Sequence, residues 1–215
     1  LSDSYLQAEV LQFRRPWRST EGLFPTGGRE IAGEAGMHLA KGFRLTIRGE
    51  ERWIEQGIRT TAGVRPGTAI ADEARRRIHC TANFTRGVQW RLRGRVEVLR
   101  FTDPVTGADE HGWMAAGEVR WEPARWIAVA GRVTLFQSES YGSRLYAVET
   151  TLEGLSGLTL LSGTGRRWYC HVVCRPLSDW RISARYASTE HVVGGRSNLR
   201  DGQFAAQGDF QIDPP

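Results

Sequence analysis

Lysine is nearly absent from this 215-residue sequence: Lys41 is the one lysine among 29 lysine and arginine residues. With 24 aspartate and glutamate residues, the formal net charge is +5. Arginine makes planar, bidentate contacts with carboxylates. This composition therefore predicts arginines in ion pairs with acidic residues rather than a surface of hydrated, unpaired charges. The arginines also alternate with acidic residues instead of clustering in a stripe, which argues against a nucleic-acid-binding protein.

Long hydrophobic runs are absent as well. No stretch approaches the roughly 18 to 20 apolar residues of a transmembrane helix, and the mean hydropathy is negative. A membrane β-barrel stays compatible with both facts, because every second residue of its strands faces inward. The chain begins at Leu1 without a methionine or a signal sequence, so we expect a processed protein or a part of a longer one.

Cysteine is scarce, with only Cys80, Cys170 and Cys174. This number is odd and too small for a disulfide scaffold. Cys170 and Cys174 are four residues apart on a predicted strand, so about 13 Å separates them, too far for a disulfide. All three fall among the apolar positions, while His171 has the opposite parity. Cysteines that act as small hydrophobic residues are therefore favoured over a metal site.

What the sequence does have is alternation with a period of two, which is clearest between residues 89 and 98. The apolar set is Trp90, Leu92, Gly94, Val96 and Val98, and the polar set is Gln89, Arg91, Arg93, Arg95 and Glu97. Successive side chains of a β-strand alternate between two faces, whereas a helix would scatter these arginines around its axis. A strand of roughly ten residues with one charged face is unusual in soluble sheets and typical of membrane barrels.

The same alternation recurs along the chain and predicts an all-β protein, an up-and-down antiparallel transmembrane β-barrel of about 12 strands. The expected strands are 5–13, 31–39, 43–54, 76–85, 89–101, 111–121, 126–137, 145–152, 157–162, 167–175, 180–188 and 203–213. The strand at 157–162 is included because the parity elsewhere requires one more crossing. Short turns alternate with long loops, as in outer-membrane barrels. We expect a single β-barrel domain over 1–215, or the C-terminal part of a longer chain.

Strand parity divides the side chains into an inner and an outer set. The predicted lumen-lining residues are Arg44, Arg48, Arg77, Arg91, Arg93, Arg95, Glu97, Glu118, Arg120, Arg132, Glu149, Arg167, Arg175, Arg181 and Arg185. Tryptophans of the outer parity near both strand ends predict aromatic girdles at the lipid interface: Trp53, Trp90, Trp113, Trp121, Trp168 and Trp180. A soluble sandwich core rich in tryptophan is the alternative explanation.

Several short motifs add a resemblance to a known family. They are Pro176-Leu-Ser-Asp-Trp-Arg-Ile-Ser-Ala-Arg-Tyr-Ala, Gly-Trp-Met at 112–114, Ser-Tyr-Gly-Ser-Arg-Leu-Tyr-Ala-Val-Glu at 140–149 and Gly-Thr-Gly-Arg-Arg-Trp-Tyr at 163–169. Over residues 86–190 the chain resembles the C-terminal β-barrel of bacterial helix-hairpin-helix outer-membrane proteins. The DNA-binding hairpin of that family has no counterpart here, so DNA binding does not carry over. Asp213-Pro214-Pro215 also replaces the usual closing strand that ends on an aromatic residue.

No group of residues has the spacing of a catalytic site. Twelve-stranded phospholipases of the outer membrane use Ser, His and Asn, and the five histidines of this chain do not fit that pattern. His79 and His171 are expected to form hydrogen bonds in the lumen. The loop from Gly163 to Arg167 could cradle a phosphate, but no helix follows it, so a strand connection is the better explanation. We expect no enzyme, no cofactor and no metal.

Arginines outnumber carboxylates in the inner set, which predicts a positive interior. The leading hypothesis is a porin-like barrel in the outer membrane of a Gram-negative bacterium, with a lumen that favours small anions. Two alternatives stay open: a structural or assembly barrel that binds a protein partner in the envelope, and a soluble β-barrel that binds a ligand. The expected partner is the lipid bilayer, and no nucleic acid is bound by this chain itself.

Overall fold

The computed structural model describes residues 4–15, 26–60, 67–150, 157–175, 180–193, 196–198 and 203–210. The regular elements in these ranges are strands: β1 (Tyr5–Arg15), β2 (Thr26–Ala40), β3 (Phe43–Thr60), β4 (Gly67–Arg86), β5 (Trp90–Thr102), β6 (Asp109–Ala124), β7 (Ile127–Ser138), β8 (Leu145–Val148), β9 (Leu158–Leu161), β10 (Thr164–Cys174), β11 (Trp180–Val193), β12 (Arg196–Asn198) and β13 (Gln203–Phe210). These ranges contain no helix long and apolar enough to cross a membrane.

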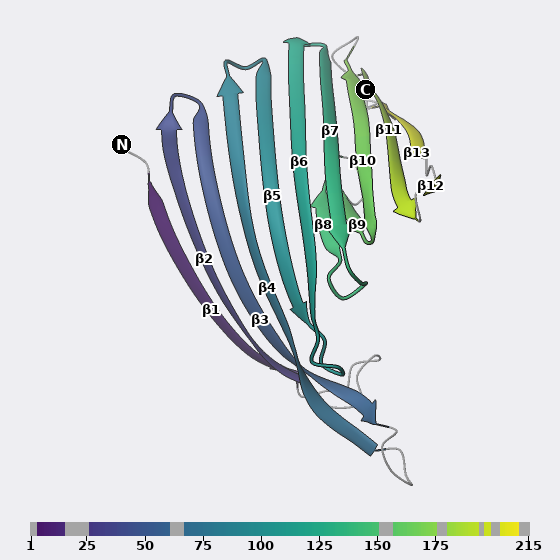
Figure 1. Ribbon diagram of the computed structural model, residues 1–215. Coiled ribbons are helices and arrows are strands. Elements are labelled where there is room, and N and C mark those ends of the chain that lie inside the picture. Colours follow the sequence, from purple (N-terminus) through teal and green to yellow (C-terminus); the bar gives the residue numbers. More distant parts are fainter. Residues whose placement is uncertain are drawn as a thin grey trace, which may run out of the picture.

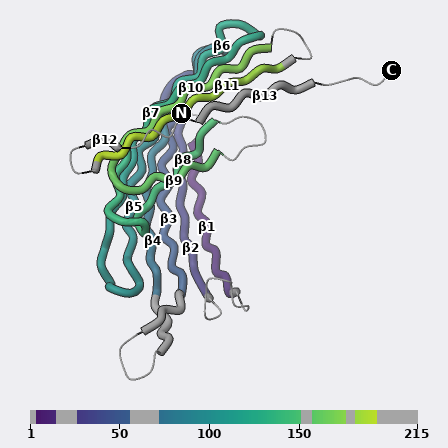
Figure 2. The backbone as a smooth tube through the Cα atoms, turned by 90° about the vertical axis from the view of Figure 1, so that its right-hand side faces the viewer, coloured from purple at the N-terminus to yellow at the C-terminus, as the bar shows by residue number. Residues whose placement is uncertain are grey.

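Most strands join one large antiparallel sheet, which is twisted and strongly curved (Figure 1). From β1 to β7 each strand pairs with the next one along the chain, and the sheet continues through β10 and β11 to β12 and β13. A view turned by 90° shows the β8–β9 pair beside this sheet rather than within it (Figure 2). In the described part of the chain, β1 pairs with β2 alone, so the sheet is open at that edge.

This architecture confirms the predicted all-β fold of up-and-down antiparallel strands, and closure into a barrel stays a prediction. The boundaries of several strands differ from the sequence prediction, most clearly at two places. β3 and β4 continue to pair out to Thr60 and Gly67, in a stretch predicted to be a connection. The short β12 lies in the predicted last loop. Both differences have one cause: backbone N–H and C=O groups keep pairing beyond the alternating side chains, since unpaired backbone groups are unfavourable.

The short turn between β2 and β3 is a place where glycine is required. Gly42 has a φ of 78°, in the left-handed region that glycine tolerates. A Cβ atom at this position would lie 2.1 Å from the carbonyl oxygen of Thr85. The amide of Thr85 donates a hydrogen bond to the carbonyl oxygen of Gly42 at 2.8 Å. This turn therefore packs directly against the end of β4 and ties two neighbouring hairpins together.

The prediction of two wall strands at 145–152 and 157–162 is wrong. β8 and β9 form there, but they pair only with each other in the described structure. β7 pairs directly with β10, where Thr164 lies opposite Gln137. The amide of Ser138 donates a hydrogen bond to the carbonyl oxygen of Gly163 at 2.8 Å, which joins the two ends of the segment between β7 and β10. A pair of antiparallel strands brings the chain back to the end of the barrel where it started, whether the pair belongs to the wall or lies inside it. The even number of strands therefore could not show that β8 and β9 are not wall strands.

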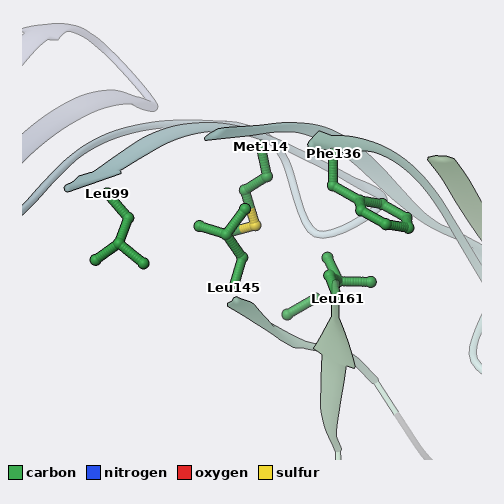
Figure 3. Close-up of a cluster of buried hydrophobic side chains, with 6 residues drawn as sticks. Leu99, Met114, Phe136, Leu145 and Leu161 are labelled. Carbon is green, nitrogen blue, oxygen red and sulfur yellow. The ribbon is translucent and has the colours of Figure 1, made fainter. Parts of the chain in front are cut away.

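The β8–β9 pair, here called the inner hairpin, packs on the concave face of the sheet. Leu145 and Leu161 of the inner hairpin lie against side chains that point down from the sheet (Figure 3). The buried cluster consists of Leu99, Met114, Phe136, Leu145, Ala147 and Leu161. Burying a side chain of this size contributes roughly 1.5–3 kcal/mol. The cluster holds the inner hairpin on the sheet, and its side of the sheet is called the inner face below.

Candidate functional site

Backbone register places the predicted lumen residues on the inner face. One row of paired residues runs through Arg48, His79, Glu97, Met114 and Phe136. The last two contact the inner hairpin, which identifies the face of the whole row. Residues separated by an even number of positions on one strand share a face, and so do residues paired directly across neighbouring strands. By these two rules the inner face also carries Arg44, Arg77, Arg91, Arg93, Arg95, Glu118, Arg120, Arg132, Arg167, Arg175, Arg181 and Arg185.

A ladder of ion pairs crosses the inner face from β2 to β5. The pairs are Arg48 with Glu34 and with Glu50 (3.6 Å each), Arg77 with Glu50 (2.6 Å) and with Glu97 (3.8 Å), and Arg95 with Glu97 (2.6 Å). Glu97 is only 2% exposed. Breaking a buried pair by removing one partner typically costs about 3–5 kcal/mol. These arginines therefore brace the sheet, and their charge is largely compensated.

Glu149 binds two arginines of the sheet from the inner hairpin. Its Oε1 accepts a hydrogen bond from Arg167 Nε at 2.7 Å, and its Oε2 accepts one from Arg167 Nη2 at 2.9 Å. Arg185 Nη2 also donates to Oε2. Arg132 and Arg185 donate to the backbone carbonyls on either side of Glu149, at 2.5 and 3.1 Å. We call these contacts the clasp. Glu149 thus contacts arginines of the inner face, and it does so from the hairpin and not from the predicted wall strand.

The base of the inner hairpin approaches β6 closely because Gly112 has no side chain. A Cβ atom there would lie 2.4 Å from the carbonyl oxygen of Ser143. Ser143 Oγ accepts a hydrogen bond from the amide of Ser140 at 3.0 Å. Ser138 Oγ accepts one from the amide of Gly163 at 2.9 Å. Small residues and serine hydroxyls thus fix where the chain leaves and rejoins the sheet.

Part of the arginine surplus has no carboxylate partner in the described structure. Arg91 and Arg93 of β5 make no ion pair among these residues. Arg93 lies opposite Glu118 in the register, but the nearest ion pair of Glu118 is with Arg132, at 3.9 Å. Arg44 stacks on the ring of Tyr5 with its guanidinium 5.2 Å from the ring centroid. The part of the inner face nearer the short turns therefore keeps uncompensated positive charge.

The outer face is apolar and exposed over a band of similar length on neighbouring strands. On β5 the band runs from Trp90 to Val98, and on β6 from Trp113 to Trp121. Each run has eight residue steps, about 26 Å at roughly 3.3 Å per residue. Other large exposed apolar residues on this face are Leu6, Val10, Ile47, Ile78, Leu92, Val96, Val119, Val133, Leu135 and Ile182. Monomeric soluble proteins rarely expose so continuous an apolar surface.

The predicted girdle tryptophans lie on the outer face where their side chains are described. Trp90 and Trp121 stack beside the short turns, with ring centroids 5.4 Å apart. Toward the other end of the same strands, Trp113 Nε1 donates a hydrogen bond to Gln137 Oε1 at 3.2 Å. One end of the apolar band is thus lined by a stacked aromatic pair and the other by a tryptophan with a polar partner, as amphipathic rings at an interface require.

Three further tryptophans were predicted to belong to the girdles: Trp53, Trp168 and Trp180. Trp168 of β10 lies against Tyr186 of β11, with centroids 5.2 Å apart. Trp53 lies on β3 and is half-buried. The side chain of Trp180 lies outside the described residues. A lipid-facing role for these rings is tested by nothing in the geometry and stays a prediction.

Sequence parity missed a belt of charge that ends the apolar band on its long-loop side. Its outer-face ion pairs are Glu51–Arg76, Arg100–Asp109, His111–Glu139 (3.6 Å) and Arg166–Glu190 (2.7 Å). Hydrogen bonds from Arg100 and Thr102 lower the pKa of Asp109 to about 2. The signal was present in the sequence, since Arg100 occupies an apolar-phase position two residues after Val98.

The described residues contain no cluster of possible metal ligands, and their cysteines are unpaired. No group of three or more His, Cys, Asp or Glu side chains lies close enough there to hold a metal ion. Cys80, Cys170 and Cys174 are free thiols. Their even positions place them on the outer face with the apolar residues of β4 and β10.

Comparisons with known proteins add little to this geometry. No family model matches the chain, and no curated protein matches its sequence. Among solved structures the chain is similar to a protein described as "NanC porin structure in rhombohedral crystal form", with 10% sequence identity, a TM-score of 0.40, and coverage of 97% of this chain and 99% of the other. The resemblance to helix-hairpin-helix outer-membrane proteins finds no support in these comparisons. A similarity this low does not establish a common family, so the fold of this chain is defined by its own strand pairings.

Proposed function

We propose that this chain forms the wall of a β-barrel in a bacterial outer membrane, with an interior that passes small anions. The contrast between the two faces of β5 supports the proposal most strongly. Val96 is 53% exposed in the apolar band, whereas the adjacent Glu97 is 2% exposed on the inner face. A lipid-facing apolar band of about 25 Å and a polar interior are what a membrane barrel requires.

The preference for anions follows from the charges that the ladder and the clasp leave uncompensated. Arg91 and Arg93 make no ion pair among the described residues. A guanidinium group stays charged at every accessible pH, so its field persists in the interior. Rings of arginine or lysine favour anions in pores.

The inner hairpin narrows the space beside the sheet, and this supports a second candidate function. Its apolar cluster and its clasp hold it against the inner face. If it fills the interior, the chain is a structural barrel whose loops or rim bind a protein partner in the envelope. The third hypothesis, a soluble ligand-binding barrel, is disfavoured because the apolar band would then be exposed to water.

Planar-bilayer recording tests the proposal. We expect the purified chain to conduct, with a reversal potential in a salt gradient that indicates anion preference. Arg93→Gln should reduce this preference, because it removes a charge from the inner face. Arg100→Gln is the matched control, since it removes the same charge from the outer belt and should leave selectivity unchanged. Cation preference in the unmodified chain would contradict the proposal, and a lack of conductance would favour the structural barrel.

A further inference from the structure

A small cavity on the inner face is lined by cations. Its volume is about 80 Å³, and it lies between the end of the inner hairpin at Thr150 and the strands β6, β7, β10 and β11. Its polar lining consists of Arg120, Thr150, His171, Arg175 and Arg181. None of the described residues that line it is acidic. This composition distinguishes the cavity from the ladder, where each arginine meets a carboxylate.

The register explains why these groups converge. Arg120, Ala130, His171 and Arg185 are paired in turn across β6, β7, β10 and β11. Ala130 is small, so the side chains on either side of it have room to face each other. Arg175 follows directly after β10, and its backbone amide donates to the carbonyl oxygen of Trp126 at 2.6 Å. The backbone therefore fixes where each of these side chains begins.

His171 carries a buried polar atom that lacks a partner. The residue is 5% exposed, and its Nε2 makes no hydrogen bond in the described structure. The sequence predicted a hydrogen-bonding role for this histidine, and no described residue forms such a bond with its Nε2. Buried polar atoms nearly always have a partner, so such an exception calls for an explanation. When Nε2 carries the proton it is a donor and needs an acceptor.

The neighbouring cations differ in how far they are already compensated. Arg120 Nε donates to Glu122 at 2.8 Å. Arg181 already takes part in an interaction of its own. Arg175 makes no ion pair with any described residue. Arg175 and the Nε2 of His171 thus retain capacity for a ligand among the described residues of the cavity.

We propose that this cavity binds one small oxyanion, a phosphate or a carboxylate group, between His171 Nε2 and the guanidinium of Arg175, with Arg120 adding positive potential. The inference rests on the proposed function, because the cavity belongs to the interior of the proposed barrel. Its volume suits a single anionic group and is far below the roughly 300–1,000 Å³ of pockets that enclose a whole drug-sized ligand. A larger solute would present one such group here while it passes the inner hairpin.

Anion titration of the refolded full chain in detergent tests this site. Histidine-labelled protein is titrated with inorganic phosphate and, separately, with acetate at constant ionic strength, and the His171 imidazole signals are followed by NMR. We expect a saturable shift with at least one of the two anions. Arg175→Gln should weaken the binding by on the order of tenfold or more, and Arg175→Lys should retain part of it. Arg91→Gln, which removes an inner charge outside the cavity, should bind as the unmodified chain does.

Two results would overturn the site. One is a shift that never saturates, and the other is equal binding by Arg175→Gln and Arg91→Gln, which would indicate a diffuse field of charge. The measurement does not depend on conduction. Saturable binding in a chain that does not conduct supports the site and overturns the pore, whereas conduction without saturable binding overturns the site alone.

Discussion

Replacing Glu149 with glutamine would test what holds the inner hairpin in place. The substitution keeps the volume of the side chain and leaves the cluster around Leu145 and Leu161 intact. It removes the negative charge between Arg167 and Arg185, so two buried guanidinium groups lose their counter-ion. Removing one partner of a buried ion pair costs about 3–5 kcal/mol. The lower end applies here, because the amide oxygen of glutamine still accepts a hydrogen bond.

A loss of about 3 kcal/mol changes the equilibrium between the packed and the released hairpin by on the order of 100-fold. Hydrogen exchange of the amides of β8 and β9 measures this opening directly. Glu97→Gln is the matched control. Glu97 is also buried between two arginines, Arg77 and Arg95, but all three belong to the sheet. The Glu97→Gln substitution should lower the stability of the sheet, and it should leave the rate at which the inner hairpin opens locally unchanged.

Two outcomes would refute this reasoning. If the hairpin amides of Glu149→Gln exchange at the original rate, the apolar cluster alone holds the inner hairpin and the clasp is dispensable. If Glu97→Gln accelerates their exchange to the same extent, the hairpin opens only when the whole sheet unfolds.

The remaining predictions concern the outer face and the long-loop end. Val96→Arg should destabilise refolding into lipid vesicles by about 2–4 kcal/mol, whereas Arg93→Ala should change the free energy of unfolding by less than about 1 kcal/mol; equal costs would contradict the assignment of the faces. The ionised Asp109, held by Arg100 and Thr102, should stabilise the 103–108 loop at every pH above its ordinary pKa of 3.8, and this contribution should disappear as the pH falls through about 2. Hydrogen exchange of the loop checks this. Hydrogen bonds from Val105 and Thr106 also lower the pKa of Asp103, so part of the pH dependence should remain in Asp109→Asn, and an undiminished pH dependence would contradict the prediction.

Strand positions and faces could be predicted from the sequence because they depend on local alternation. In β5, each residue from Trp90 to Val98 has the face that its parity predicts, and the structure adds only the partners. The length of the apolar band follows from the same alternation, because Arg100 is the first charged residue at an outer-face position of β5 after Val98. Such properties need no knowledge of distant residues.

The inner hairpin and the cavity could not be predicted, because both depend on contacts between distant segments. The apolar run of Leu158 to Leu161 fits a wall strand and an inserted hairpin equally well. Only the direct pairing of β7 with β10 distinguishes them. In the same way, the missing partner of His171 Nε2 is visible only when β6, β10 and the hairpin end are placed together.

Cysteine labelling along β5 tests the central claim, that one face of this sheet contacts lipid and the other contacts water. The three native cysteines are replaced by alanine, and a single cysteine is placed in turn at each position from 91 to 96 in protein reconstituted in vesicles. We expect reaction with a water-soluble maleimide at 91, 93 and 95, and protection at 92, 94 and 96. Equal reaction at both sets of positions would show that the apolar band is not in the membrane and would contradict the account.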